Sequence, residues 1–429
     1  MSDATVRYSD LRPHQFRARL AERPVAYLPL GTLEWHGEHL PLGADAIISE
    51  GLMCECASRF GGIVMPPIHL GPDRATLQSD GGLLVGMDTA EGVTDPHRQL
   101  DGSCYWLSQG LFLQLVDAIL AQLKRAGFRA VFADGHGPSR SSWVANCLMP
   151  PSRLSAVCST LPAYKGDSMT VQMHEMTREQ IKAIAPTAIA VLCTAATEQH
   201  GPHMAVGTDT LLVSTVAERA ALAAADTVPV VITPPLAFGS SHHHYPFGGT
   251  ISLTSQTFAG VVVEVLEGLV RTGFRHLVVL NGHGGNKDLV GMASQDLVNR
   301  LDFPATVASA NYWDIAKPAM VEAGLLPAPR IPGHAGHFET SAILSLRPDW
   351  VDETARAGVR DMEGEGSGLD VDLTGAVVQT FGAWGKGPGH TDNPAAATAE
   401  LGEKLLDIAA TEVARFLRDF SKVPGPVTD

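Results

Sequence analysis

Two stretches of this 429-residue sequence repeat each other and carry the same potential metal ligands. Residues 33–46 read LEWHGEHLPLGADA, and residues 197–210 read TEQHGPHMAVGTDT. Each stretch contains a glutamate, two histidines and an aspartate at matching positions, with glycines between them. Packing alone does not explain so many metal-binding side chains in so short a segment, because Glu, His and Asp are the ordinary ligands of divalent ions.

The repeat extends well beyond these two stretches. The glutamate and the aspartate of the second stretch both lie 164 residues after those of the first. His283, in NGHGGN, follows His136, in DGHGPS, by 147 residues, and the same offset separates His244 from His97. A recurrence at nearly constant spacing predicts a duplication of one structural unit.

The copies differ in length. A chain of 45.4 kDa is too long for one ordinary core. Residues 150–171 contain Pro150, Pro151, Pro162 and Gly166, which favours a linker. We therefore predict a shortened domain over residues 1–150 (the first copy), a linker over 151–171 and a full domain over 172–429 (the second copy).

Strand-like and helix-like segments alternate in both copies. In the first copy we expect strands at 25–30, 63–66 and 129–133, helices at 46–59 and 111–125, and a long loop over 69–99. The second copy repeats this order and adds a strand at 305–309. The alternation predicts two three-layer α/β/α domains with mainly parallel sheets, in which ligands bind beyond the carboxyl ends of the strands.

Composition excludes several classes of partner. The formal net charge is −15 and the Lys and Arg residues form no cluster, which argues against a nucleic-acid partner. No apolar run approaches the roughly 20 residues of a membrane helix, so we expect a cytoplasmic protein with no membrane partner. The six cysteines are scattered without a CxxC pair and are expected to be free thiols.

The repeated residues point to a catalytic metal centre. Carboxylates and imidazoles without thiolates suit Zn²⁺, Mn²⁺ or Fe²⁺. Glu198 and His200 would point the same way along an extended chain and could reach two neighbouring ions, while Asp209 could bridge them. His283, between glycines at the end of a predicted strand, can reach the same point.

The second copy resembles the creatininase (creatinine amidohydrolase) family over residues 172 to about 406. The resemblance lies in TEQHGPHMAVGTD, FGGTISL, NGHGGN, HAGHFETS and GAWG. The first copy resembles the family through GTLEWHGEHLPLGAD, GSCYW and DGHGPS. The resemblance implies a metal-dependent α/β/α fold, two divalent metal ions (Zn, Mn or Fe), and hydrolysis of a C–N bond in a small or cyclic amide.

The resemblance also implies which residues hold the ions. Asp209 would bridge them, with Glu198 and His283 on one ion and His200 on the other. Creatininase proper has a glutamate two residues after the NGH histidine, where this chain has Gly285. The ETS glutamate then replaces it, so the expected metal ligands are Glu198, His200, Asp209, His283 and Glu339.

The catalytic residues follow from the same resemblance. His334 in HAGH matches the family's proton-shuttling histidine. A metal-activated water would attack a carbonyl carbon, and His334 would protonate the leaving nitrogen. Glu339 would act with it. Trp313 and His244 are candidates for lining the substrate pocket, although Trp313 could equally be a core aromatic residue. His242 and His243, in the HHH run, are expected to be solvated.

The first copy has only part of this set. Its candidate second metal site is Glu34, His36, Asp45 and His136. No equivalent of His334 or Glu339 follows in the first copy, so it is either a non-catalytic domain or a metal site with a ligand from elsewhere. For the whole chain we expect a metal-dependent hydrolase whose small-molecule substrate is a cyclic amide or a related small carbonyl compound, with a homo-oligomeric state. The alternative is a metal-stabilised binding or assembly protein without catalysis.

Overall fold

The computed structural model describes residues 5–36, 40–73, 75–77, 83–85, 105–139, 142, 171–359, 380 and 382–426. The linker predicted over 151–171 lies outside these residues, apart from Val171. Among the described residues, no helix has both the length and the apolar character needed to cross a membrane.

The first copy contains a parallel sheet of three strands in the order β2-β1-β5. Two short strands, β3 and β4, pair antiparallel inside the stretch that the sequence predicts as a loop, so that prediction is wrong there. The elements are η1 (Tyr8–Asp10), α1 (Pro13–Glu22), β1 (Val25–Leu30), α2 (Ala44–Phe60), β2 (Ile63–Val64), β3 (Ala75–Leu77), β4 (Leu83–Val85), α3 (Gln109–Ala126) and β5 (Ala130–Gly135).

The second copy contains a parallel sheet of four strands in the order β7-β6-β8-β9. Its strands are β6 (Ile189–Thr194), β7 (Val230–Ile232), β8 (His276–Asn281) and β9 (Thr306–Asn311). Its longer helices are α6 (Thr208–Ala224), α7 (Ser255–Thr272), α8 (Lys287–Gln295), α9 (Tyr312–Glu322), α10 (His337–Leu346) and α13 (Ala399–Phe420). The shorter ones include η3 (Met173–Glu175), α5 (Arg178–Ile184), η4 (His242–Phe247), η5 (Gly284–Asn286), η6 (Asp296–Arg300), α11 (Glu353–Ala357) and α12 (Ala383–Lys386).

The two sheets share one strand order, since β2-β1-β5 corresponds to β7-β6-β8. The predicted α/β fold with mainly parallel sheets is confirmed. The equivalent strand pairs, β1 with β5 and β6 with β8, lead into the metal-ligand motifs of the two copies. The register pairs Leu30 with Gly135 and Thr194 with Asn281, so both motifs of a copy leave its sheet at the same edge.

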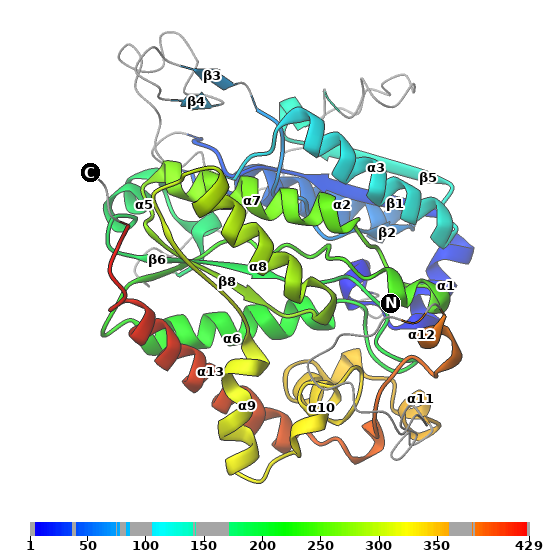
Figure 1. The fold of residues 1–429 in the computed structure, drawn as a ribbon. Helices are drawn as coiled ribbons and strands as arrows, with labels where there is room; N and C mark the ends of the chain where they lie inside the picture. The colour runs from blue at the N-terminus through cyan, green and yellow to red at the C-terminus, as the bar shows by residue number, and fades with distance from the viewer. Residues whose placement is uncertain are drawn as a thin grey trace.

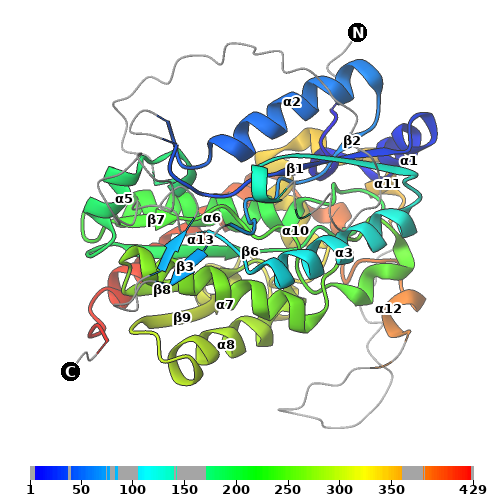
Figure 2. The ribbon, with the colours of Figure 1, turned by 90° about the horizontal axis from the view of Figure 1, so that it is seen from above.

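Helices cover both faces of each sheet. In the second copy, Ile189 and Val191 pack toward α6, α9, α10 and α13, on the side of the sheet opposite α7 (Figure 1). In the first copy, α2 and α3 lie on opposite sides of β1 (Figure 2). Leu28 of β1 and Leu192 of β6 belong to the same hydrophobic core as α3 and α7. The two copies are therefore joined by a continuous core.

Each copy also fixes the metal-ligand loop of the other. The Gly43 N–H donates to the His174 carbonyl in η3 at 3.2 Å, and the Gly207 N–H donates to the Ser9 carbonyl in η1 at 3.1 Å. A Cβ at Gly43 would lie 2.8 Å from the His174 Cβ, and one at Gly207 would lie 2.7 Å from the Ser9 carbonyl oxygen. Only glycine fits at these points, directly before the helices that carry the motif aspartates.

Two histidines with lowered pKa values, His69 and His174, lie side by side near this contact. The rings of His69 and His174 lie 5.8 Å apart, and the Nδ1 atom of each is buried without a hydrogen-bond partner in the described part of the chain. Burial and the neighbouring His174 lower the pKa of His69 to about 3. Burial likewise lowers the pKa of His174.

We therefore expect stability to fall as the pH drops below about 6.5, where the unfolded chain takes up protons that the folded chain does not. The loss of unfolding free energy due to His69 should be about 1 kcal/mol at pH 5. This figure is smaller than the full shift of its pKa implies, because the residue is only partly buried and solvent reduces the effect. Thermal unfolding of His69→Gln between pH 7 and 4.5 should show a shallower acid loss than the wild type, with His14→Gln as the exposed control. An unchanged acid slope in His69→Gln would contradict this account.

Candidate metal centre

Four elements of the second copy bring its predicted ligands together. Glu198 and His200 lie in the loop after β6, and His283 follows β8. Asp209 lies in the first turn of α6 and Glu339 in the first turn of α10. A carboxylate at a helix amino terminus is favoured by the helix dipole. All five side chains are buried.

The two carboxylate oxygens of Asp209 face two different groups. Oδ1 lies 3.1 Å from His200 Nε2, which is also 3.7 Å from Glu339 Oε2. Oδ2 lies 3.2 Å from His283 Nδ1, which is also 3.2 Å from Glu198 Oε1. This arrangement is typical of a carboxylate that bridges two cations, each with its own histidine and second carboxylate.

Backbone carbonyls fix the orientation of both imidazoles. His200 Nδ1 lies 3.1 Å from the Glu198 carbonyl oxygen, and His283 Nε2 lies 3.1 Å from that of Ser240. A carbonyl only accepts, so these nitrogens carry the hydrogens and the opposite nitrogens can present lone pairs to the carboxylates. Asp209 Oδ2 is buried and accepts no hydrogen bond from any described residue. The residues therefore fit divalent ions, which would satisfy these atoms.

The buried carboxylates of the cluster favour a bound positive charge, either a proton or a cation. Burial alone would lower the pKa of His200, but Asp209, Glu339 and Glu198 raise it to about 10. Burial, opposed by His200 and assisted by Asp209, raises the pKa of Glu339 to about 8. Burial works against the charged form of His283 as well, yet Glu198 and Asp209 hold its pKa well above the usual range. In the metal-free protein, the raised pKa values favour protons on His200, His283 and Glu339, and a divalent ion would displace these protons.

Gly285 cannot carry the glutamate found in creatininase proper. A Cβ at this position would lie 2.1 Å from the Ser240 carbonyl oxygen and 2.6 Å from His283 Nε2. The carboxylate comes instead from α10, where Glu339 accepts a hydrogen bond from the Ala335 N–H at 2.6 Å. Ala335 has a φ of +49°, unusual for a residue with a side chain, so the HAGH loop is strained next to the site.

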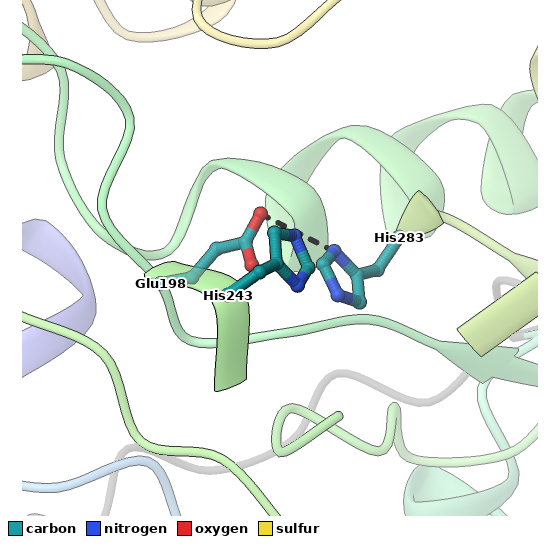
Figure 3. Close-up of side chains that lie close together, drawn as sticks. All are labelled: Glu198, His243 and His283. Atoms are coloured by element: carbon teal, nitrogen blue, oxygen red, sulfur yellow. Dashed lines mark ion pairs between the residues drawn. The ribbon is translucent and has the colours of Figure 1, made fainter. Parts of the chain in front are cut away.

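His242 is exposed, as expected, but His243 is half-buried beside the candidate site, so the prediction of solvation is wrong for His243. Its ring stacks on His283 at 5.9 Å with an interplanar angle of 8°. One ligand atom from each of Glu198, His243 and His283 lies within 4.8 Å of the others (Figure 3). Helix η4 turns His243 inward, and the absent side chain of Gly285 leaves it room, because a Cβ there would be 3.3 Å from His243 Cε1.

A second group of side chains surrounds His334. His334 Nε2 lies 3.0 Å from the Gln199 carbonyl oxygen, and Nδ1 lies 3.7 Å from Glu198 Oε1. The ring of His244 stacks on it at 4.2 Å. Burial and the neighbouring His200 hold the pKa of His334 well below its usual range, and burial lowers the pKa of His244 to about 4. Both are therefore neutral imidazoles near neutral pH.

Gln199 fixes the proton positions in this group, and sequence reasoning missed it. The Gly201 N–H donates to Gln199 Oε1 at 2.8 Å, which sets the orientation of the amide. Gln199 Nε2 then donates to His244 Nδ1 at 2.8 Å and to the Gly389 carbonyl at 3.0 Å. The remaining hydrogen of His244 is on Nε2, which lies 3.6 Å from Glu198 Oε1.

The aromatic residue beside these imidazoles is Trp384, not Trp313. The Trp384 ring lies 4.7 Å from that of His244, 5.3 Å from His243 and 5.6 Å from His334. Trp313 is 7% exposed in the hydrophobic core, with its ring against Tyr312. The expectation that Trp313 covers the substrate is corrected accordingly, because α9 turns it into the core. Trp384 belongs to the GAWG segment, and this family motif is the sequence signal that could have identified it as a residue near the site.

The first copy brings its predicted ligands together in a similar way. His36 Nδ1 lies 3.0 Å from the Glu34 carbonyl oxygen, and Nε2 lies 3.1 Å from Asp45 Oδ1, as in His200. His136 Nε2 lies 3.6 Å from Glu34 Oε1. Burial, with the charges of Asp73 and Asp45, raises the pKa of Glu34 to about 9. Asp73 was not predicted, since it lies in an aperiodic stretch; His97 lies outside the described residues.

Comparisons with known proteins show which family this chain resembles. The family model described as "Creatinine amidohydrolase" matches residues 9–147 and 174–417. Creatinine amidohydrolase of Pseudomonas putida is 30% identical over 278 residues, which cover 59% of this chain and 98% of the relative. The mycofactocin precursor peptide peptidase of Mycobacterium tuberculosis is 33% identical over 199 residues, covering 44% of this chain and 70% of the relative.

Solved structures give the same result for the fold. A mutant creatininase of a "Zn-Zn type" has a TM-score of 0.50 and 29% identity, over 59% of this chain and 98% of that chain. The family model covers most of the sequence in two segments, one on each side of the predicted linker. The chain belongs to the creatininase family.

Proposed function

We propose that the second copy hydrolyses a C–N bond of a small or cyclic amide with the help of two divalent ions (Zn, Mn or Fe). The observation that carries the proposal is the division of the Asp209 carboxylate between His200 and His283. Ligands in this arrangement would hold two ions close together, as in two-metal hydrolytic centres. Bound ions would polarise the carbonyl group of the substrate and lower the pKa of a water molecule.

The proposed ligands divide between the two positions. Glu198 and His283 would hold one ion, His200 and Glu339 would hold the other, and Asp209 would contribute to both. His243 stands beside the first position as an additional donor. Imidazole and carboxylate donors accept zinc and manganese alike, and zinc is supported by the structural relative of the "Zn-Zn type".

His334 is the proposed proton carrier. Its Nε2–H is held by the Gln199 carbonyl, so Nδ1 presents a lone pair toward Glu198 and the metal cluster. A neutral imidazole in this position can accept a proton from the attacking water and deliver it to the leaving nitrogen of the amide. The hydrogen bond to a backbone carbonyl keeps the ring oriented through both steps.

The pocket residues limit the class of substrate. His243, His244 and Trp384 form a cluster of rings beside the proposed ions. Flat ring faces favour contact with a small planar group, such as the ring of a cyclic amide (lactam). The relatives include both a creatinine amidohydrolase and a precursor peptide peptidase, so amide hydrolysis is the chemistry that their names share.

Removal and return of metal tests this proposal. Chelation should abolish hydrolysis on a panel of lactams, cyclic ureas and short peptides, and Zn²⁺ or Mn²⁺ should restore it, with about two ions per second copy. Elemental analysis and turnover on the same sample give both values. Ion binding without turnover on the whole panel would contradict the proposal and favour a metal-stabilised binding or assembly protein.

A further inference from the structure

Asp73 of the first copy stands where the second copy has Ser241. The loops after β2 and β7 start from equivalent bridges, Leu30 with Ile68 and Thr194 with Leu236. Counting onward from Ile68 and Leu236 places Asp73 opposite Ser241 in the repeat. The duplication has therefore put a carboxylate where the active copy has a hydroxyl.

Contacts of two glycines confirm this alignment. A Cβ at Gly71 would meet the Gly31 carbonyl oxygen and Ser139 Oγ. A Cβ at Gly239 would meet the corresponding atoms, the Ala195 carbonyl oxygen and the Asn286 amide. Both loops thus pass the same two neighbours, two residues before Asp73 and Ser241 respectively.

Asp73 faces the same partner as Ser241. The Ser241 hydroxyl donates a short hydrogen bond to Glu198 Oε2. In the first copy, one ligand atom from each of Glu34, Asp73 and His136 lies within 4.8 Å of the others. Where the second copy satisfies a carboxylate with a hydroxyl, the first copy adds a second carboxylate, and two such groups are stabilised side by side by a shared proton or by a cation between them.

Unsatisfied buried atoms point into this cluster. His136 is 2% exposed, and its Nδ1 lies 2.7 Å from Ser139 Oγ. Its Nε2 is buried, faces Glu34, and makes no hydrogen bond to any residue that the structure describes. Asp45 Oδ2 is likewise buried without a described partner. A buried nitrogen and a buried oxygen without partners are rare unless a ligand satisfies them.

We propose that the first copy binds a divalent cation through Glu34, Asp73 and His136, with Asp45 beside them. With Asp45 included, the site offers three carboxylates and one imidazole, whereas its counterpart offers the carboxylates of Glu198 and Asp209 and the imidazoles of His283 and His243. The first-copy site is therefore richer in oxygen and favours a harder ion such as Mn²⁺. The described part of the first copy places no histidine like His334 next to it. The ion is structural: it ties together the loops that follow β1, β2 and β5.

The test uses the full chain with the second copy disabled. Asp209→Asn combined with His283→Ala removes ligands of the second copy, and Mn²⁺ is then titrated and followed by electron paramagnetic resonance. This background should still bind Mn²⁺, and bound Mn²⁺ should raise its thermal unfolding midpoint. Adding Asp73→Ser, which restores the residue of the second copy, should weaken Mn²⁺ binding at least about tenfold.

Controls make the outcome decisive. Asp117→Ser removes an exposed carboxylate from α3 in the same copy and should leave Mn²⁺ affinity unchanged. Circular dichroism checks folding, and Asp73→Asn replaces Asp73→Ser if the latter is unfolded. A background protein that binds no Mn²⁺, or an Asp73 variant that binds it as tightly as the background, would overturn the proposal. Because the readout is metal binding in a chain whose second copy is disabled, failure here leaves the proposed hydrolase untouched.

Discussion

The substitution Asp209→Asn is expected to remove both ions from the second copy and to lower hydrolysis by at least about a thousandfold. The cause is the position of its carboxylate, which turns one oxygen to His200 and the other to His283. An asparagine has the same shape but replaces one oxygen with an NH2 group, which cannot bind a cation. A single isosteric change should therefore disrupt both positions while the fold is retained.

The matched control is Asp45→Asn, the equivalent change in the first copy. Asp45 makes the same contact with His36 that Asp209 makes with His200. Elemental analysis of Asp45→Asn should show that the ions of the second copy remain. If Asp209→Asn kept both ions or substantial turnover, the bridging role of Asp209 would be wrong.

The substitution His334→Gln is expected to lower kcat by about 10²–10⁴-fold, the usual contribution of a positioned proton carrier. Both ions should remain bound, since the proposed ligands are other side chains. The pH profile of kcat should lose the limb that depends on this imidazole. Metal content and the pH profile measured on one preparation separate this role from a structural one.

His337→Gln is the control within the same HAGH segment. His337 is only partly buried and is neither a proposed ligand nor the proposed proton carrier, so its loss should leave kcat within a few fold of the wild type. Loss of an ion from His334→Gln would show that His334 is a metal ligand, and equal activity of the two variants would exclude it as the proton carrier.

The proximity of the proposed metal ligands was predictable because short-range patterns place these residues. Glu198 and His283 follow apolar strands directly, and parallel pairing of β6 with β8 brings their loops to one edge. The spacing from His200 to Asp209 reaches from that loop into the first turn of α6. The fold class follows from the same alternation of strands and helices.

Residues that depend on distant segments could not be predicted this way. Trp384 reaches His244 only through the packing of α12 against η4, and no periodicity distinguishes it from Trp313. His243 entered the site because Gly285, far along the chain, leaves space for it. A role for Asp73 can be inferred only when the two copies are aligned through their equivalent β-bridges, Leu30 with Ile68 and Thr194 with Leu236.

The shared core was also beyond the sequence pattern. The repeat predicts two separate units, but α3 and α7 pack into one core, and Gly43 and Gly207 each bond to the other copy. Amphipathic periodicity shows that a helix has a buried face and not which sheet will cover it. The same contacts position both metal-ligand loops, so the first copy supports the geometry of the second.

Anomalous X-ray scattering from crystals of the full chain loaded with zinc tests the central claim most directly. We predict two strong peaks in the second copy, one among Glu198, Asp209 and His283 and the other among His200, Asp209 and Glu339. Asp209 should lie between them. A single peak in the second copy, or no peak beside Asp209, would contradict a binuclear centre at this position.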